Sequence, residues 1–120
     1  MLTPLRRFGD KGEGIAADFL KKKGYAILAR QVVIGKLGEL DLVCRHVRTL
    51  VFVEVKTRSD RQYGLPEESI GEWKRARFRR SIEAWLQQHQ LTHADIRADV
   101  VAIEMGKGEP VIRHLEGVEL

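Results

Sequence analysis

The sequence contains very little cysteine and no long apolar run. Cys44 is the one cysteine among 120 residues, which excludes a disulfide-stabilised scaffold and a zinc site built from cysteines. With tyrosine counted as polar, the longest apolar runs, such as residues 26–29 and 50–53, span only four residues. Runs this short exclude a transmembrane helix and the core of a signal peptide. We therefore expect a cytoplasmic protein without a membrane partner.

The composition is that of a folded, charged domain. Hydrophobic residues make up 43% and charged residues 32% of the chain, which is not typical of a disordered protein. The length fits a single domain over residues 1–120, and the glycines near the start indicate that residues 1–9 are flexible. Lysine and arginine number 21 against 17 aspartates and glutamates, a net charge of +4. This excess favours a polyanionic partner, although many soluble proteins are equally basic.

The hydrophobic periodicity predicts two helices and five strands. One helix covers about residues 11–23 and ends at Gly24, and a longer one covers residues 67–89 with an apolar stripe. Strand patterns cover residues 25–34, 39–44, 49–56, 99–105 and 111–115. The order α-β-β-β-α-β-β places a helix between the third and fourth strands, where it can make a parallel crossover. The predicted fold is α/β, a mixed β-sheet flanked by helices.

Charged side chains gather on one face of the predicted hairpin formed by residues 39–44 and 49–56. Alternation along a strand places Glu39 with Asp41, and Glu54 with Lys56, while Leu40 and Leu42 turn to the core on the other face. A turn centred between residues 47 and 48 would set Asp41 opposite Glu54 and Glu39 opposite Lys56. The sequence thus predicts a cluster of three carboxylates and one lysine.

Two acids facing one another repel unless a positive charge offsets them. A divalent cation is one solution, since Mg²⁺ takes oxygen ligands and needs only one or two carboxylates. Lys56 could then orient or deprotonate a water, or stabilise charge on a phosphate. The alternative is an ordinary charged sheet face, with Glu39 and Lys56 as a cross-strand ion pair. The placement of two acids in strands otherwise made of core residues favours the metal site.

At this point the residues resemble a known family. Asp41 followed by Glu54-Val55-Lys56 resembles the PD-(D/E)xK nuclease signature, and a wider set is similar to the YraN-like family of proposed bacterial endonucleases from about residue 9 to residue 117. That set consists of Gly12-Glu13, Ala16-Ala17, Lys23-Gly24-Tyr25, residues 38–43, residues 51–58, Tyr63-Gly64, Lys74 and Asp99-Val100-Val101. One departure is Gln31, at a position where the family usually has asparagine. If that asparagine contacts DNA or orients an acid in the family, Gln31 would change the contact here.

The resemblance implies a restriction-endonuclease-like fold, similar to that of archaeal Holliday junction resolvases. It implies that Asp41, Glu54 and Lys56 are catalytic, and that Glu13 joins Asp41 and Glu54 as a metal ligand, with Glu39 in support. The implied cofactor is Mg²⁺, for which Mn²⁺ can substitute. By analogy with the resolvases, and because 120 residues make a small footprint on a branched duplex, we expect a homodimer.

Basic residues at positions 74–80 form a stripe on the longer predicted helix. Lys74 and Arg77 align on the helix, as do Arg75 and Arg79, and Arg58 follows the nuclease-like motif. Such a stripe can bind phosphates, although a charge run is usually only a solvated helix face. Both tryptophans, Trp73 and Trp85, are expected to pack in the core or at its edge rather than to stack on bases.

These features favour a Mg²⁺-dependent endonuclease that hydrolyses phosphodiester bonds in DNA, including branched or junction DNA. The alternative is a non-catalytic nucleic-acid-binding module on the same fold that acts within a complex. A binder would gain nothing from acids that face phosphates, which argues for the enzyme. The sequence does not separate DNA from RNA as the substrate.

Overall fold

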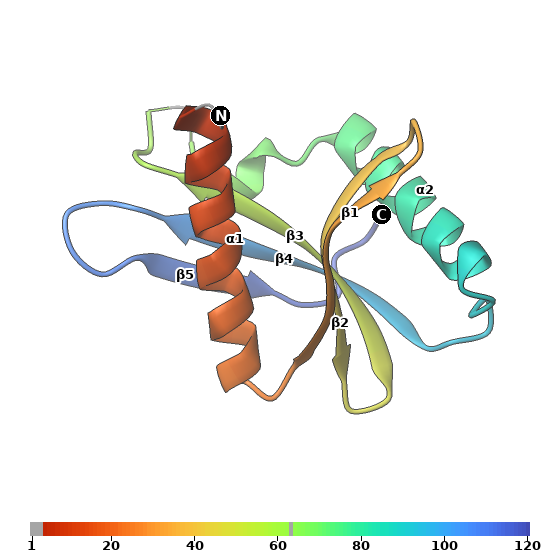
Figure 1. Ribbon diagram of the computed structural model, residues 1–120. Coiled ribbons are helices and arrows are strands. Elements are labelled where there is room, and N and C mark those ends of the chain that lie inside the picture. Colours follow the sequence, from red (N-terminus) through yellow and green to blue (C-terminus); the bar gives the residue numbers. More distant parts are fainter. Residues whose placement is uncertain (1–3, 63) are drawn as a thin grey trace.

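The computed structural model describes residues 4–62 and 64–120, and its elements follow the expected order. Helix α1 comes first, three strands follow, helix α2 comes next and two strands end the chain (Figure 1). A short 3₁₀ helix, η1 (Pro66–Ser69), precedes α2. The bounds are α1 Pro4–Lys22, β1 Ala26–Ile34, β2 Gly38–His46, β3 Thr49–Arg58, α2 Glu72–Gln88, β4 Ile96–Glu104 and β5 Val111–Leu115.

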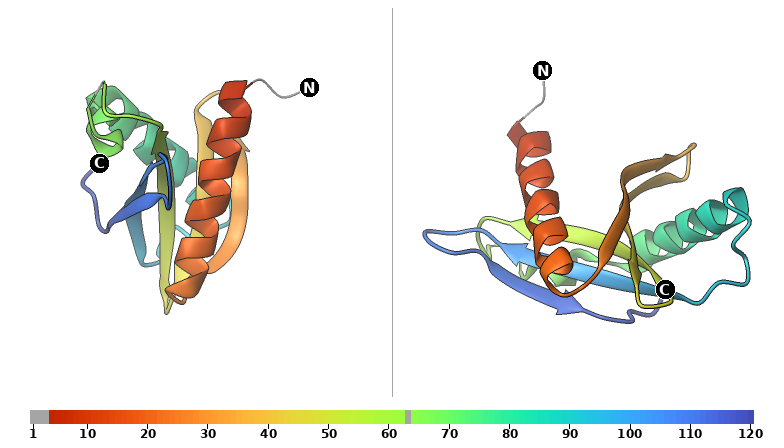
Figure 2. Two further views of the ribbon diagram at one scale, coloured as in Figure 1. Left: turned by 90° about the vertical axis from the view of Figure 1, so that its left-hand side faces the viewer. Right: turned by 60° about the horizontal axis from the view of Figure 1, so that its bottom comes forward.

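The five strands form one mixed sheet in the order β1-β2-β3-β4-β5. Strands β3 and β4 are parallel, and the other neighbours are antiparallel. Helix α2 makes the crossover between the two parallel strands, as the sequence predicts. The two helices lie on opposite sides of the sheet (Figure 2). The predicted α/β fold, a mixed sheet flanked by helices, is confirmed.

Each helix covers its own apolar cluster. On the α1 side, Ala16 and Leu20 pack against β2, β3 and β4, where Leu42 and Val53 are fully buried. The α2 side is built around the fully buried Phe52 of β3, and the ring of Trp85 meets it edge to face at 5.4 Å. Burying one such large side chain stabilises the fold by about 1.5–3 kcal/mol. The predicted stripe on α2 is confirmed, with Phe78, Ile82, Trp85 and Leu86 all buried.

Both helices begin at a different residue from the one predicted. Helix α1 begins at Pro4 rather than near residue 11, so residues 4–9 of the segment expected to be flexible are helical, and residues 1–3 lie outside the described part. Helix α2 begins at Glu72 rather than residue 67, because Ile70 and Gly71 adopt extended backbone angles after η1. The predicted end of the first helix holds: Gly24 has a φ of +93°, typical of a C-terminal cap.

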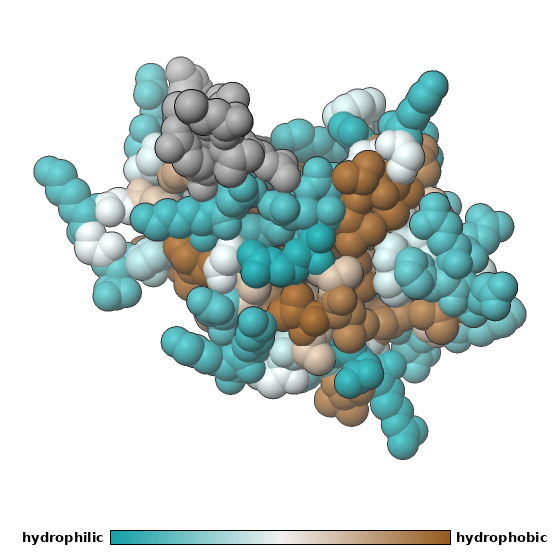
Figure 3. Space-filling view, viewed as in Figure 1, coloured by the Kyte–Doolittle hydropathy of each residue, from teal (hydrophilic) through white to brown (hydrophobic). Residues whose placement is uncertain are grey.

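The surface seen in Figure 3 is hydrophilic over α2, and apolar side chains gather over β1. Strand β1 is an edge of the sheet, and its Leu28 and Val33 are exposed. In the part of the chain that the structure describes, no helix combines the length and the hydropathy needed to cross a bilayer.

At Gly12, helix α1 lies close to Thr57 of β3. A Cβ added at Gly12 would lie 3.1 Å from Thr57 Cγ2 and closer still to Thr57 Oγ1. Gly12→Ala should therefore push α1 away from β3 and lower the free energy of unfolding by about 1–3 kcal/mol, measured by chemical denaturation. Thr57→Ala should restore part of the loss in the double variant.

The matched control for this prediction is Gly14→Ala, in the same helix. A Cβ at Gly14 meets only Arg30 Nη2, at 3.9 Å, so the change should be neutral or stabilising through helix propensity. Equal destabilisation by both variants would contradict the steric explanation.

Candidate active site

The site forms where β2 and β3 separate. Their ladder runs from His46↔Thr49 to Leu42↔Val53 in the predicted register and then stops. The prediction that Asp41 faces Glu54, and Glu39 faces Lys56, as ladder partners is therefore wrong. Instead, the backbone N–H of Val55 donates a 2.8 Å hydrogen bond to Asp41 Oδ2. The Asp41 side chain thus takes the place of a backbone carbonyl as the partner of Val55 N–H. Beyond this point β2 and β3 diverge.

The alternation of side chains also breaks at Asp41. Leu42 packs in the α1-side cluster, but Leu40 packs in the α2-side cluster, so the prediction that both share one face is wrong. On β1, the ladder pairs Arg30↔Leu42 and Val32↔Leu40 flank Gln31, which has a φ of +50°. Left-handed backbone is uncommon for a residue other than glycine and persists only where the surrounding structure holds it.

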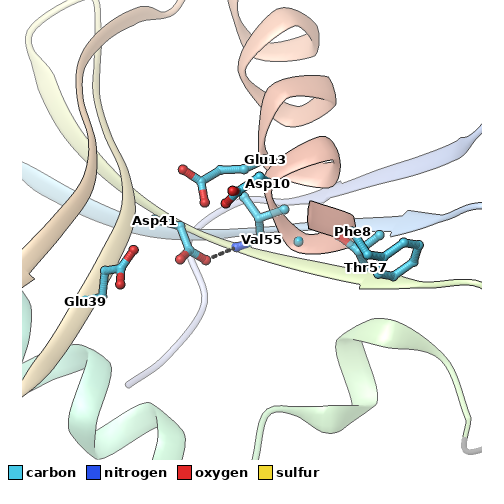
Figure 4. A pocket seen from close by; sticks show the side chains of 8 residues that line it. Phe8, Asp10, Glu13, Glu39, Asp41, Val55 and Thr57 are labelled. Carbon is cyan, nitrogen blue, oxygen red and sulfur yellow. Dashed lines mark hydrogen bonds between the residues drawn. The ribbon is translucent and has the colours of Figure 1, made fainter. Parts of the chain in front are cut away.

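Four acidic side chains line the pocket of about 340 Å³ that opens at this separation. Figure 4 shows Glu13 and Asp10 of α1 pointing toward Asp41 of β2, with Glu39 on the far side of the same space. Val55 and Thr57 of β3 complete the wall. The structure thus brings the predicted Glu13, Asp41 and Glu39 together, and it adds Asp10.

Glu13 is the least exposed of these four acids. Its side chain is only 6% exposed, and its Oε1 has no hydrogen-bond partner. Burial raises the pKa of Glu13, and a hydrogen bond from Gln31 offsets part of that shift. A buried carboxylate oxygen without a partner costs about 1–3 kcal/mol or more, so the fold keeps Glu13 here at the expense of stability.

Asp41 is perturbed more strongly. Burial, and then the negative charge of Glu54, raise the pKa of Asp41 to about 8, and Glu13 adds to the effect. The hydrogen bond from Val55 N–H acts in the opposite direction but does not cancel it. The carboxylates therefore repel one another as the sequence predicts, and either a proton or a cation must offset the repulsion.

Glu54 and Lys56 line a second pocket of about 260 Å³ together with Glu39, Trp73, Lys74 and Arg77. Lys56 Nζ lies 3.2 Å from Glu54 Oε1, so Lys56 pairs along its own strand. Glu39 lines both pockets and joins them. The nearby charge of Lys56, and then burial, lower the pKa of Lys74, so two ammonium groups lie close together beside the acids.

The acids fit Mg²⁺ by their chemistry but do not form a closed cage. Within residues 4–62 and 64–120, no group of three or more His, Cys, Asp or Glu side chains is arranged to hold a metal ion. Mg²⁺ usually needs only one or two carboxylates and completes its shell with water and phosphate. The unpartnered Glu13 Oε1 beside Asp41 offers such oxygen ligands, so the donor set fits.

The predicted basic residues do not all lie at the site. Lys74 and Arg77 line the second pocket, and Arg58 is near enough to lower the pKa of Lys74 further. Arg75 instead lines a different pocket with Glu67 and the C-terminal residues. Arg75, also expected to bind nucleic acid, therefore lies outside the pocket that holds Lys74 and Arg77.

The comparisons with known proteins identify a family. The model of the uncharacterised protein family UPF0102 matches residues 12–103. The chain belongs to this family. Relatives named "UPF0102 protein" include those of Roseiflexus castenholzii, 48% identical over 83% of this chain and 81% of the relative, and Nocardia farcinica, 43% identical over 97% and 96%. A third, from Carboxydothermus hydrogenoformans, is 36% identical over 94% of this chain and 95% of the relative.

Sequence reasoning missed Asp10 at the site of this UPF0102 chain and misjudged Trp73. Asp10 accepts a 2.6 Å hydrogen bond from Gln31 Nε2, so Gln31 does contact acids of α1. The i, i+3 spacing of Asp10 and Glu13 would have placed both on one helix face, had the earlier start of α1 been recognised. Trp73 is 65% exposed, so the prediction that it packs is wrong, whereas Trp85 is buried as predicted.

Proposed function

We propose that this UPF0102 protein is a Mg²⁺-dependent endonuclease of the PD-(D/E)xK type that hydrolyses phosphodiester bonds in DNA, including branched DNA. The observation that carries the proposal is the buried, unpartnered Glu13 Oε1 facing Asp41, with the Glu54–Lys56 pair in the adjoining pocket. Fixed negative charge beside several cations suits a site that binds both a metal ion and a phosphate. The resemblance of the Asp41, Glu54 and Lys56 motif to restriction-endonuclease-like proteins supports the same conclusion.

Each side chain has a role in this proposal. Glu13, Asp41 and Glu54 would hold the ion, which supplies positive charge to the scissile phosphate and makes a water more acidic. The Val55 N–H fixes the Asp41 carboxylate, and Gln31 orients the acids of α1. Lys56, held at 3.2 Å by Glu54, would donate hydrogen bonds to the phosphate as negative charge develops on it.

A cleavage panel tests the proposal. The substrates are linear, flapped, four-way and single-stranded DNA, with RNA counterparts, each incubated with Mg²⁺, Mn²⁺ or EDTA. We expect cleavage of DNA with either metal and none in EDTA. The cations Lys56, Lys74 and Arg77 in the second pocket would also suit the second candidate, a non-catalytic nucleic-acid-binding module. Binding without cleavage of any substrate would support that module and reject the enzyme. Light scattering with and without DNA would check the expected homodimer.

Lys74→Ala should weaken binding to duplex and single-stranded DNA alike. Lys74 lies in a cluster of positive charge with Lys56 and Arg58, which an incoming phosphate would relieve. Phosphate contacts carry no base information, so the salt dependence of log K should fall by about one unit for the lost contact. Binding titrations in EDTA at several salt concentrations measure both quantities.

Arg79→Ala is the matched control, because Arg79 is an exposed cation of the same helix whose ion pair is with Glu83 at 3.9 Å. This variant should change neither the affinity nor the salt slope. The same loss in both variants would mean that the helix attracts DNA only through its overall charge.

A further inference from the structure

Trp73 is a large aromatic side chain left in solvent beside the proposed active site. It lies in the first turn of α2, off the buried stripe, and is 65% exposed. It lines the same pocket as Glu54 and Lys56. Exposed tryptophans are uncommon, because their burial is strongly favourable. The exposure of Trp73 beside Lys56, the predicted catalytic lysine, therefore calls for an explanation.

The surroundings hold the indole in place. Arg77 Nε donates a 2.6 Å hydrogen bond to the carbonyl oxygen of Leu37, and the Arg77 guanidinium lies 5.3 Å from the Trp73 ring centroid. Gly38 makes room for this arginine, since a Cβ there would lie 2.7 Å from Arg77 Nε. A guanidinium anchored on the β1–β2 turn thus supports one tryptophan on α2.

The charges around Trp73 select the kind of ligand. Lys56, Lys74 and Arg77 line the pocket, against Glu39 and Glu54. Aromatic side chains set among cations are the arrangement by which proteins bind unpaired nucleotides, because the bases stack on the rings while the cations hold the phosphates. Bases within a duplex are already stacked on one another and offer no free face to a side chain.

We propose that Trp73 stacks on an unpaired nucleobase whose adjacent phosphates are held by Lys74 and Arg77. The inference rests on the proposed function for its placement next to the scissile phosphate. It narrows the substrate class to nucleic acid with unpaired nucleotides at the cleavage point, such as flapped, branched or single-stranded molecules. Trp73 is then a specificity-determining residue, and it takes no part in the chemistry.

Binding in EDTA tests the stacking without requiring cleavage. The probes are an oligothymidylate, an oligouridylate and a blunt DNA duplex, and the proteins are the wild type, Trp73→Leu and Trp73→Phe. Loss of the ring in Trp73→Leu should weaken single-strand binding by about 5- to 150-fold and leave duplex affinity within about two-fold. Trp73→Phe should keep most of the affinity, because it keeps an aromatic face. The two single strands show whether DNA or RNA is preferred.

Intrinsic fluorescence gives a second readout. The single strand should quench the wild-type emission and leave Trp73→Phe unchanged, because the remaining Trp85 is only 6% exposed. Circular dichroism melts establish that the variants fold. Equal affinities of wild type and Trp73→Leu for the single strand, an equal loss for strand and duplex, or a change in oligomeric state alone would overturn the inference.

The two proposals fail separately. Wild-type cleavage of a flapped duplex with Mg²⁺, together with unchanged single-strand binding by Trp73→Leu, would reject the stacking and keep the nuclease. Selective loss of single-strand binding by Trp73→Leu, with no cleavage by the wild type, would reject the nuclease and keep the stacking.

Discussion

Replacing Asp41 by asparagine should abolish metal-dependent DNA cleavage and leave DNA binding in EDTA unchanged or tighter. The side chain keeps its shape, and its amide oxygen can still accept the hydrogen bond from Val55 N–H. The variant loses a negative charge beside Glu54 and Glu13. The charge helps to hold a cation when one is bound, and without a cation it repels a phosphate once Asp41 has lost its proton, at about pH 8. Calorimetric titration with Mg²⁺ or Mn²⁺ should therefore show weaker metal binding.

The same substitution should stabilise the metal-free protein near pH 8. The folded state raises the pKa of Asp41 from 3.8 to about 8, so between these values the folded chain retains a proton that the unfolded chain has released. Wild-type stability in EDTA must then fall as pH rises through this range. Asparagine has no proton to lose, so Asp41→Asn removes the decline and is more stable at pH 8 by on the order of a few kcal/mol. Denaturation curves at pH 5 and pH 8 measure the difference.

Lys56→Ala distinguishes two hypotheses, a catalytic metal site and a purely structural ion pair between Glu54 and Lys56. Lysine is not a metal ligand, so this variant should lose cleavage while it largely retains metal binding. If the Glu54–Lys56 pair were only structural, Lys56→Ala would mainly destabilise the sheet, and metal binding would be absent from the wild type too. A wild type that binds no Mg²⁺ or Mn²⁺, even with DNA present, would refute the nuclease as stated.

The hairpin shows how far the sequence could predict this site. Alternation and a short turn set the register of β2 and β3 correctly from Leu42 to His46. Those rules hold only while backbone groups pair with backbone groups. At Asp41 a side chain takes the bond of Val55, and Gln31 on the other neighbouring strand adopts a left-handed backbone. Alternation carries no signal for either event, so it misplaced Leu40 and the opposing pairs.

Other misses have a similar cause. The start of α1 was obscured because glycines at positions 9, 12 and 14 lower helix propensity, whereas Gly12 is needed for the close approach to Thr57. Trp73 was expected to pack because apolar residues usually do. Its exposure follows from the extended residues before α2 and from the anchored Arg77, which are tertiary features. The approach of Asp41 to Glu54 could be predicted, because both residues follow the correctly paired part of the hairpin. The acids of α1 could not be predicted in this way, since Glu13 came from the family resemblance alone and Asp10 was missed.

A second set of buried charges lies on the α1 side, away from the acid pocket. Asp99 of β4 is fully buried and accepts hydrogen bonds from Arg97 Nε, Arg97 Nη2 and Gly117 N–H at 2.9–3.0 Å. His114 Nε2 lies 2.7 Å from the same carboxylate, and its Nδ1 lies 2.7 Å from Lys23 Nζ. An ammonium can only donate, so Nδ1 accepts and the ring proton is on Nε2, facing Asp99. The network joins β4, β5, the end of α1 and the C-terminal turn.

Asp99→Asn should cost about 3–5 kcal/mol of unfolding free energy, because it leaves the Arg97 guanidinium without its buried partner. Tyr25→Phe removes only the hydroxyl that accepts from Arg97 Nη2 and should cost about 0.5–1.5 kcal/mol. Asp18→Asn, an exposed aspartate of α1, is the matched control and should have little effect. Urea denaturation at neutral pH gives the three values, and equal small losses for Asp99 and Asp18 would show that the network is not a major source of stability.

The pH dependence supplies a second test of the Asp99 network. Burial alone would raise the pKa of Asp99, but the hydrogen bonds from His114 and Arg97 outweigh it and lower the pKa from 3.8 to about 2. A depressed carboxylate pKa stabilises the fold above about pH 4, and this contribution is lost as pH falls toward 2. Hydrogen bonds with arginines also lower the pKa values of Glu67 and Glu104, so the wild-type loss over this range has several sources. In Asp99→Asn, the loss of unfolding free energy between about pH 4 and pH 2 should be smaller than in the wild type by about 2–3 kcal/mol. If the variant loses as much stability over this pH range as the wild type, the charge does not reside on Asp99.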